Sequence, residues 1–235
     1  MKCLALPETI LEKHPIWMEV KKKLKINNKI YYPLTVDEQI DFINFVEENK
    51  SFFDRFGEQG IEENDSFQQI IFYCVIRRGN QFFVYQRGGT EAGSKETRLA
   101  MKISVGVGGH IEPFDTKITD ALYRELDEEL VFKKDGSPIL FKKTDGMIDN
   151  DIFNTITDVH VIGIVKEETG GIGMVHTGLV TIVDLRDVSI DISIRENEGN
   201  IFGQFMDKDE YDKFITSGTA VPEIWTEILK NNNIF

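Results

Sequence analysis

The stretch that decides the fold begins Gly106-Val-Gly-Gly-His-Ile-Glu-Pro-Phe-Asp115 and continues Thr116-Lys-Ile-Thr-Asp-Ala-Leu-Tyr-Arg-Glu-Leu-Asp-Glu-Glu-Leu-Val-Phe132. Its glycines predict a tight turn, and the part that follows predicts a helix through Phe132. At about 100° per residue, four apolar side chains of this helix form one stripe that must be buried. They are Ile118, Leu122, Leu126 and Leu130. We expect three polar side chains on the opposite, solvent face: Arg124, Asp127 and Asp120.

Three glutamates of the same helix converge on about one quarter of its surface, because they are spaced by one, three and four residues. They are Glu125, Glu128 and Glu129. Carboxylates this close repel one another, and Glu129 projects into the apolar sector, where an unpaired charge is costly. A hard divalent cation such as Mg²⁺ removes both costs, since it takes oxygen ligands. The alternative is a solvated acidic face, which the position of Glu129 and the preceding Gly-Gly turn disfavour.

The stretch resembles the box of the Nudix hydrolases, which runs Gly, five residues, Glu, seven residues, then Arg-Glu-aliphatic-any-Glu-Glu-any-Gly-aliphatic. Gly109 is followed after five residues by Asp115, and the core Arg124-Glu-Leu-Asp-Glu-Glu129 is intact. Three departures concern the loop and the end of the helix. Asp115 stands for Glu, eight residues separate it from Arg124, and Val131 stands for the final Gly.

The resemblance implies a metal-dependent hydrolase that cleaves a phosphoanhydride in a nucleoside diphosphate linked to another group. Mg²⁺ or Mn²⁺ would be held by a main-chain carbonyl near Gly108 and by the three glutamates, Glu125, Glu128 and Glu129. Glu125 and Glu128 would act in catalysis, and Arg124 would orient Glu125 or tie the helix to the loop through Asp115 or Glu112. His110, inside the turn, would contact a phosphate or a metal-bound water; the alternative is ordinary loop packing.

Composition limits the class of protein. The chain has 235 residues and a net charge of −13, which argues against binding a nucleic-acid polymer through its phosphates. Two cysteines, Cys3 and Cys74, make no disulfide framework and indicate a reducing compartment. Pro7 and Glu8 interrupt the N-terminus too early for a signal peptide, and no apolar run is long enough for a membrane span. We therefore expect a cytoplasmic protein with a small-molecule diphosphate substrate and no membrane partner; a homodimer is left open.

Residues 1–57 are expected to form an N-terminal extension with one amphipathic helix packed on the core, and residues 58–235 the Nudix hydrolase domain. Thr35 with Glu38 is a capping box that begins the helix. The lysine run Lys21-Lys22-Lys23-Leu24-Lys25 is interpreted as a solvated patch, with a phosphate contact as the alternative.

The rest of the chain alternates strands and helices. Residues 66–86 predict a hairpin, and later strands are expected at residues 101–107, 155–165, 174–183 and 188–194. Asp207 with Glu210, and then Pro222, begin two further helices. The fold class is therefore α/β, and the order of elements agrees with the α/β/α sandwich and mixed sheet of the Nudix fold.

Other carboxylates and other functions stay open. Glu167 and Glu168, or Glu196 and Glu198, are candidates for a further ligand or general base, although each pair is interpreted first as solvated loop charge. A Nudix-fold ligand sensor with weak or no catalysis is the main alternative function, because the loop departs from the motif. An isomerase of phosphorylated isoprenoids has less support, because the sequence places neither cysteine near the box.

Overall fold

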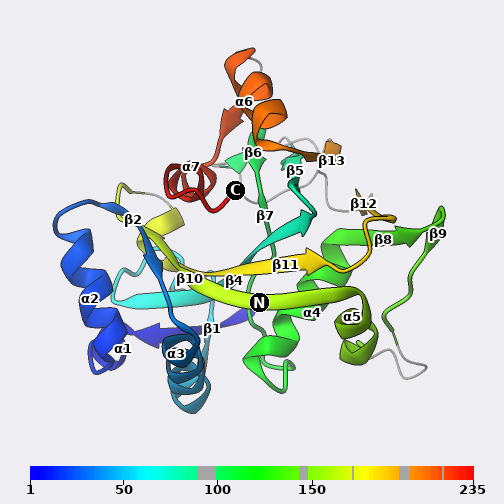
Figure 1. The fold of residues 1–235 in the computed structure, drawn as a ribbon. Helices are drawn as coiled ribbons and strands as arrows, with labels where there is room; N and C mark the ends of the chain where they lie inside the picture. Colours follow the sequence, from blue (N-terminus) through cyan, green and yellow to red (C-terminus); the bar gives the residue numbers. More distant parts are fainter. Residues whose placement is uncertain (89–98, 143–147, 171, 196–201, 219) are drawn as a thin grey trace. The chain divides into compact units, whose positions relative to one another are not determined.

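A computed structural model describes residues 1–88, 99–142, 148–170, 172–195, 202–218 and 220–235. The chain forms two compact units, each made of three segments. Figure 1 labels helices and strands of both. The first comprises Met1–Tyr73, Gly109–Leu122 and Val161–Thr181, and the second comprises Cys74–Gly108, Tyr123–His160 and Ile182–Phe235. None of the helices in the described part of the chain is long and apolar enough to cross a membrane.

The first unit is built on antiparallel pairs. Strand β1 (Lys2–Pro7) pairs with β3 (Ser51–Asp54) and with the start of β4 (Phe67–Arg78). Strand β2 (Lys29–Pro33) pairs with β10 (Thr157–Glu167) in the register Tyr31↔Val165. The middle of β1 is fully buried, so this N-terminal strand is part of the core of its unit.

Three helices follow in the N-terminal segment: α1 (Glu8–Leu11), α2 (Pro15–Leu24) and α3 (Val36–Asn49). Helix α2 begins where the His14 ring accepts a hydrogen bond from the amide of Ile16, with Pro15 at the first helical position. Helix α3 begins at the predicted capping box, in which Thr35 and Glu38 exchange side-chain and backbone hydrogen bonds.

The single helix expected in residues 1–57 is therefore one of three, and that expectation was wrong. The lysine run lies on α2, whose buried side chains recur at helical spacing beneath the charges: Ile16, Trp17, Val20 and Leu24. Lys22, Lys23 and Lys25 are exposed, as the solvated interpretation predicts, whereas Lys21 is half-buried and pairs with Glu8 and Glu168. The proposed division into residues 1–57 and 58–235 stays a prediction.

The second unit contains the strands that precede the glycine turn. Strand β4 turns at Gly79, whose φ of 63° suits glycine, into β5 (Gln81–Gln86), as the hairpin pattern predicts. Strand β5 pairs with β6 (Lys102–Ser104) and with β13 (Phe202–Met206), and β14 (Val221–Pro222) pairs parallel to β6. Strand β7 (Gly106–Val107) pairs with β4 and leads into the turn.

A separate three-stranded sheet in this unit has the order β12-β8-β9. Its strands are β8 (Leu130–Lys134), β9 (Ser137–Pro138) and β12 (Ile190–Ile194). The helices are α5 (Asn150–Ile156), α6 (Lys208–Thr216) and α7 (Ile224–Asn231). The helix start predicted at Asp207 and Glu210 is confirmed, and the structure shows that the two residues form a capping box at the start of α6.

Strands β4 and β11 (His176–Leu185) pass through both units, and a 3₁₀ turn at Ile172–Met174 precedes β11. The larger sheet has 11 strands in the order β14-β6-β5-β4-β11-β10-β2, with β1, β3, β7 and β13 paired off this path. Because β14 runs parallel to β6 while the other strand pairs named above are antiparallel, the sheet is mixed. The predicted α/β class is confirmed.

Candidate active site

Helix α4 (Ile118–Glu129) carries the three clustered glutamates in its last two turns. The helix ends at Glu129 and strand β8 begins at the next residue, so the predicted end at Phe132 was wrong. Val131 and Phe132 are strand formers, and they pair with Ser193 and Ile192 of β12. Val131, where the box has glycine, is thus the second residue of a strand.

The predicted apolar stripe is confirmed for Ile118, Leu122 and Leu126 of α4, which are buried. Leu130 is also buried, but as the first residue of β8. The solvent face was predicted wrongly at two of three positions. Arg124 is 8% exposed and Asp127 is 7% exposed, whereas Asp120 is half-buried. Asp127 is buried because its carboxylate meets two cations, Lys142 Nζ at 3.3 Å and Arg195 Nη2 at 3.5 Å.

Arg124 joins two of the three glutamates. Its Nη1 donates to Oε1 of Glu125 at 2.9 Å and to Oε2 of Glu128 at 3.0 Å. One guanidinium nitrogen therefore lies within hydrogen-bond distance of both carboxylates, which brings their oxygens to one place and offsets part of their repulsion. The predicted contact of Arg124 with Glu125 is observed; a tie through Asp115 or Glu112 stays a prediction.

Glu129 and Glu125 also act on buried groups of strands β4 and β5. Burial raises the pKa of the Cys74 thiol, and the charges of Glu129 and Glu125 raise it further. Burial likewise raises the pKa of the Tyr85 phenol, with Glu129 adding to the shift. Glu129 is half-buried. These couplings place two of the carboxylates within electrostatic reach of the strands, as expected for a glutamate on the apolar side of the helix.

Cys74 therefore lies closer to the box glutamates than the sequence suggested. The thiol is fully buried and its pKa is raised, so it is held protonated, which is the opposite of the environment that activates a cysteine. A buried, protonated thiol is unreactive, so Cys74 gives no support to the isomerase alternative even though it lies near the box.

The turn before the helix is fixed by hydrogen bonds and by glycine. The carbonyl of Gly106 accepts from the Tyr85 hydroxyl at 2.9 Å, and the amide of Gly106 donates to Ser104 Oγ at 3.1 Å. Gly108 has a φ of 131°, a conformation that other residues rarely adopt. A side chain at this position would strain the turn, so glycine is required here whether or not its carbonyl holds a metal.

Asp115, which stands where the box has glutamate, closes a short turn in the first unit. Its buried carboxylate accepts from the amide of Glu112 at 2.7 Å, while its own amide donates to the carbonyl of Glu112 at 3.0 Å. The shorter aspartate side chain is suited to such local backbone bonds. The departure at this position is therefore accommodated by a closed turn.

His110 belongs to a polar cluster of the first unit. Its Nε2 lies 2.9 Å from Gln69 Oε1 and 3.0 Å from Nε2 of the buried His176. Gln69 in turn donates from Nε2 to Oε2 of Glu62 at 3.1 Å. These contacts agree with the loop-packing alternative for one ring nitrogen. A substrate contact by His110 stays a prediction.

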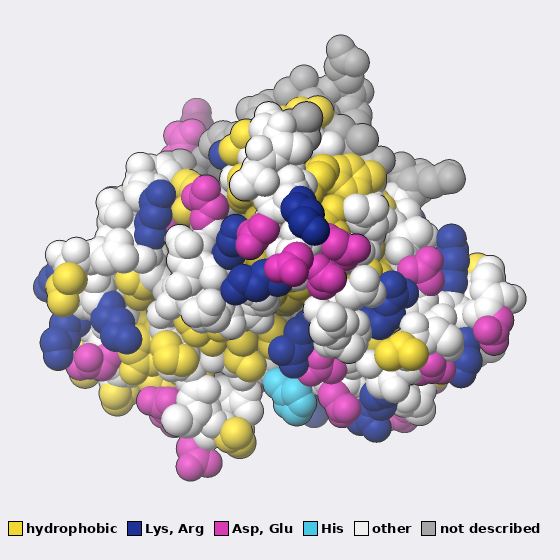
Figure 2. Space-filling view, turned by 45° about the horizontal axis from the view of Figure 1, so that its top comes forward, with side chains coloured by type: hydrophobic (Ala, Val, Ile, Leu, Met, Phe, Trp, Pro, Cys, Tyr) yellow, Lys and Arg dark blue, Asp and Glu magenta, His cyan; other side chains and the backbone are white. Residues whose placement is uncertain are grey.

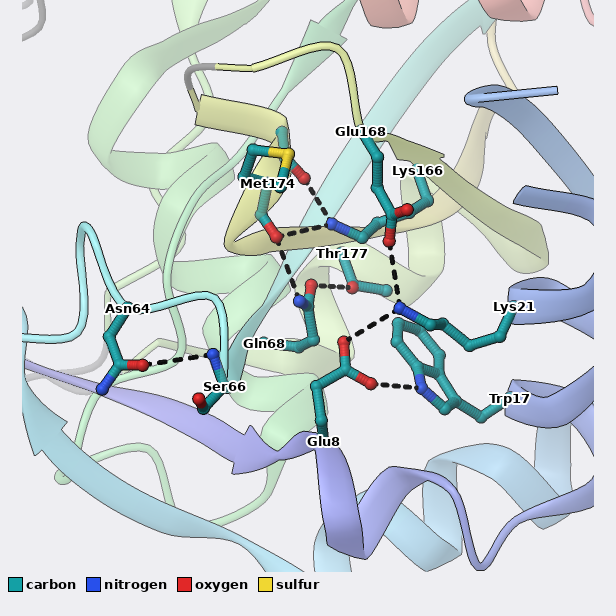
Figure 3. A network of polar contacts seen from close by, with 11 residues as sticks. Glu8, Trp17, Lys21, Asn64, Ser66, Gln68, Lys166, Glu168, Met174 and Thr177 are labelled. Carbon is teal, nitrogen blue, oxygen red and sulfur yellow. Dashed lines mark hydrogen bonds and ion pairs between the residues drawn. The ribbon is translucent and has the colours of Figure 1, made fainter. Parts of the chain in front are cut away.

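Of the carboxylates outside the box, Glu167 and Glu168 are both engaged within the first unit, Glu168 with Lys21 (Figure 3). Glu167 is 3% exposed and accepts from the amide of Thr169 at 2.7 Å. Glu168 accepts from Lys21 Nζ at 3.1 Å, and the same lysine lies 3.6 Å from Glu8. Their carboxylates thus serve local structure; the other candidates, Glu196 and Glu198, lie outside the described residues.

Three residues that support the candidate site were not singled out from the sequence. Glu47 of α3 accepts at Oε2 from the amide of Ile118, the first residue of α4. Glu223 is buried and accepts from Ser104 Oγ at 2.6 Å and from Arg87 Nε at 3.2 Å. Arg195 bonds to the end of α4. No local pattern marks these long-range partners, although Arg195 directly follows a predicted strand.

The donor set of the glutamate cluster suits a hard cation, since it consists of carboxylate oxygens. Among the described residues, no three His, Cys, Asp or Glu side chains already surround a single point. Glu125 and Glu128 instead both accept hydrogen bonds from Arg124. The chemistry of the carboxylate donors fits a divalent metal, whereas a metal site formed by them stays a prediction. On the face drawn in Figure 2, acidic side chains lie beside lysines and arginines.

No family model matches the chain. Among curated proteins, YmaB of Bacillus subtilis strain 168 is 27% identical over 151 residues, which is 62% of each chain. The match thus spans less than two thirds of the length of that relative.

Among solved structures, Tm1382, a candidate Nudix hydrolase, is similar over 100% of both chains, with a TM-score of 0.60 and 19% identity. DR0079 from Deinococcus radiodurans is more distant, with a TM-score of 0.45 and 12% identity over 79% of this chain and 94% of that chain. The resemblance seen in the box is thereby confirmed at the level of architecture: this chain has the fold of the Nudix hydrolases.

Proposed function

We propose that the protein is a divalent-metal-dependent hydrolase of a phosphoanhydride bond in a nucleoside diphosphate linked to another moiety. The observation that carries the proposal is the meeting of Glu125 and Glu128 at one nitrogen of Arg124, at the end of the box helix in a Nudix fold. Both carboxylates contact the same nitrogen, so their oxygens lie close together. Carboxylates this close repel one another, and binding a cation would offset that repulsion.

The residues proposed to hold Mg²⁺ or Mn²⁺ are Glu125, Glu128 and Glu129, with the carbonyl of Gly108. When bound, the ion would neutralise the diphosphate and lower the pKa of a water molecule. Glu129 and Glu125 would keep their carboxylates on the strand side of the helix, and Arg124 would orient Glu125 and Glu128. The general base is not assigned to a residue.

The net charge of −13 supports a small phosphate-containing substrate whose negative charge is neutralised by a bound metal cation. It argues against a nucleic-acid polymer, which needs a basic surface. We also propose a cytoplasmic location. Both cysteines are free and buried, which is compatible with a reducing compartment.

The test is a substrate panel of a nucleotide-sugar, a dinucleotide and a nucleoside triphosphate, each assayed for phosphoanhydride cleavage with Mg²⁺ or Mn²⁺. Cleavage of at least one member by the parent, lost in the Glu125→Gln variant, is the expected result. The matched control is Glu63→Gln, which makes the same change in an exposed glutamate outside the box.

A ligand sensor is the second candidate. It is favoured by the altered loop and because no cluster of three potential metal-binding side chains is preformed among the described residues. It predicts that members of the same panel bind, measured by calorimetry, and leave the protein unchanged. Binding without cleavage under any metal would replace the hydrolase proposal with this one.

A further inference from the structure

Helix α4 ends without the glycine that commonly terminates helices. The last carbonyls of a helix have no partner within it, and a glycine in the left-handed conformation usually allows the chain to satisfy them. Here Glu129 is followed at once by Leu130 and Val131 of strand β8. Some other group must therefore satisfy the carbonyls at the end that carries the glutamates.

Arg195, which directly follows β12, supplies the missing donors. Its amide donates to the carbonyl of Glu129 at 2.8 Å. Its guanidinium donates to the carbonyl of Asp127 from Nε at 2.9 Å and from Nη2 at 2.6 Å, and Nη2 also reaches the carbonyl of Leu130 at 3.1 Å. The same nitrogen lies 3.5 Å from the Asp127 carboxylate.

These contacts do two things at one place. They satisfy three carbonyls around the end of the helix. The planar guanidinium serves the carbonyls of Asp127 and Leu130, a geometry that lysine cannot reproduce, and the backbone amide serves that of Glu129. They also place a positive charge at the negative end of the helix dipole. The pairing of Ile194 with Leu130 brings Arg195 to this position, so the cap is part of the β8–β12 register.

We propose that Arg195 is a positioning residue for the metal-binding glutamates, taking over from the glycine that Val131 replaces. The inference rests on the proposed metal site. Glu128 and Glu129 belong to the last turn of α4, the turn that frays first when its carbonyls lose their partners. Fraying would move their carboxylates out of reach of a shared ion, because coordination by Mg²⁺ tolerates little distortion.

The chain offers a matched control in Arg186. Its amide donates to the carbonyl of Ile156, and its Nε donates at 3.1 Å to the carbonyl of Thr157, the C-cap of α5. It also pairs with an aspartate, Asp158. Arg186 thus makes the same kinds of contact at the end of a helix that carries none of the box glutamates.

The experiment measures binding of Mn²⁺ alone by calorimetry to the parent, Arg195→Gln, Arg195→Lys and Arg186→Gln, with thermal unfolding recorded for each. The dissociation constant should rise about tenfold or more in Arg195→Gln, as for other residues that orient metal ligands, and less in Arg195→Lys. Arg186→Gln should stay within about twofold of the parent even though it too lowers the unfolding temperature, since it loses the same kinds of contact elsewhere.

Parent-like Mn²⁺ affinity in Arg195→Gln would overturn this inference but leave the proposed metal site intact. An equal loss of Mn²⁺ affinity in Arg186→Gln would have the same consequence. A parent that binds no Mn²⁺ would overturn the metal site and this inference with it. If Arg195→Gln does not fold, Arg195→Lys decides the question, because unchanged affinity in that folded variant also contradicts a role that depends on the planar fork.

Discussion

If Glu129 holds a metal as proposed, stability and metal binding make opposite demands on this residue. It is half-buried, and its charge acts on two buried groups, Cys74 and Tyr85. A carboxylate in this position is costly for the metal-free fold, because it is partly removed from water and lies near other glutamates. A residue of this kind is expected where charge is needed for binding.

Changing Glu129→Gln should therefore lower turnover by orders of magnitude while leaving the metal-free protein as stable or slightly more stable. One ligand charge is lost where transition-state charge develops, and like-charge repulsion is relieved. Turnover and denaturant unfolding without metal measure the two effects. Glu227→Gln, in an exposed position of α7, should change unfolding by no more than about 0.5 kcal/mol and leave turnover unchanged. Equal turnover in the parent and Glu129→Gln would remove Glu129 from the site.

His14 gives the fold a dependence on pH. Burial lowers the pKa of His14 below its ordinary 6.5, although Asp41 opposes the shift. The folded state thus binds the proton less tightly than the unfolded state does. The corresponding stability is fully present above about pH 6.5 and is lost as pH falls towards the folded pKa.

The variant His14→Asn tests this assignment, since asparagine also begins helices well but does not titrate. Between pH 7.5 and 5 the unfolding free energy of the parent should fall more steeply than that of the variant, as measured by denaturant titration at each pH. Identical slopes would show that His14 does not contribute.

Helix α4 is held at its start by the N-terminal segment. Glu47 of α3 accepts from the amide of Ile118 at 2.9 Å, and Lys50 donates to Glu47 and, at 3.0 Å, to the carbonyl of Thr116. A carboxylate at this end satisfies an amide that has no partner in the helix and is favoured by the helix dipole.

Replacing Glu47→Ala should destabilise the protein by about 1 kcal/mol, the usual size of a lost N-terminal cap. Denaturant unfolding measures the change. The neighbouring Glu48, which is exposed on the same helix, is the control, and Glu48→Ala should be neutral. A similar effect at both positions would assign the loss to charge on α3 and not to the cap.

The elements that the sequence predicted well are those with local signals. The helix starts at Thr35 and Asp207 and the hairpin around Gly79 depend on neighbouring residues, and all three are confirmed. The end of α4 was misplaced because Leu130 and Phe132 fall on or beside the apolar stripe in a helical projection, while their pairing with β12 draws them into a strand.

The polar side of α4 shows the same limit. A helical projection assigns Arg124 and Asp127 to solvent because it contains no information about the rest of the chain. Asp127 is buried by Lys142 and by Arg195, which are distant in sequence. The glutamate cluster could be predicted from spacing alone, whereas its supports at Glu47 and Arg195 could not.

For the molecule as a whole, the N-terminal segment is structural. Strand β1 is hydrogen-bonded to β4, and its residues Cys3 to Leu6 are fully buried. A free tail would leave these apolar side chains in water. We therefore expect residues 1–57 to be as resistant to protease as the core of their unit.

Limited proteolysis of the native protein measures this directly. Fragments should begin at Met1 under conditions that cut exposed loops, because cleavage of β1 requires its pairs with β3 and β4 to open. Rapid loss of residues 1–57 that leaves an active protein would contradict the expectation and would support an accessory extension.

We propose that the glutamates at the end of α4 make the protein a metal-dependent phosphoanhydride hydrolase. The most direct measurement is the turnover of whichever panel substrate the protein cleaves, before and after an excess of chelator and again after Mg²⁺ is restored. We expect turnover to disappear with chelator and to return with the metal, because the carboxylates alone would repel the substrate. Full turnover in excess chelator would contradict the claim.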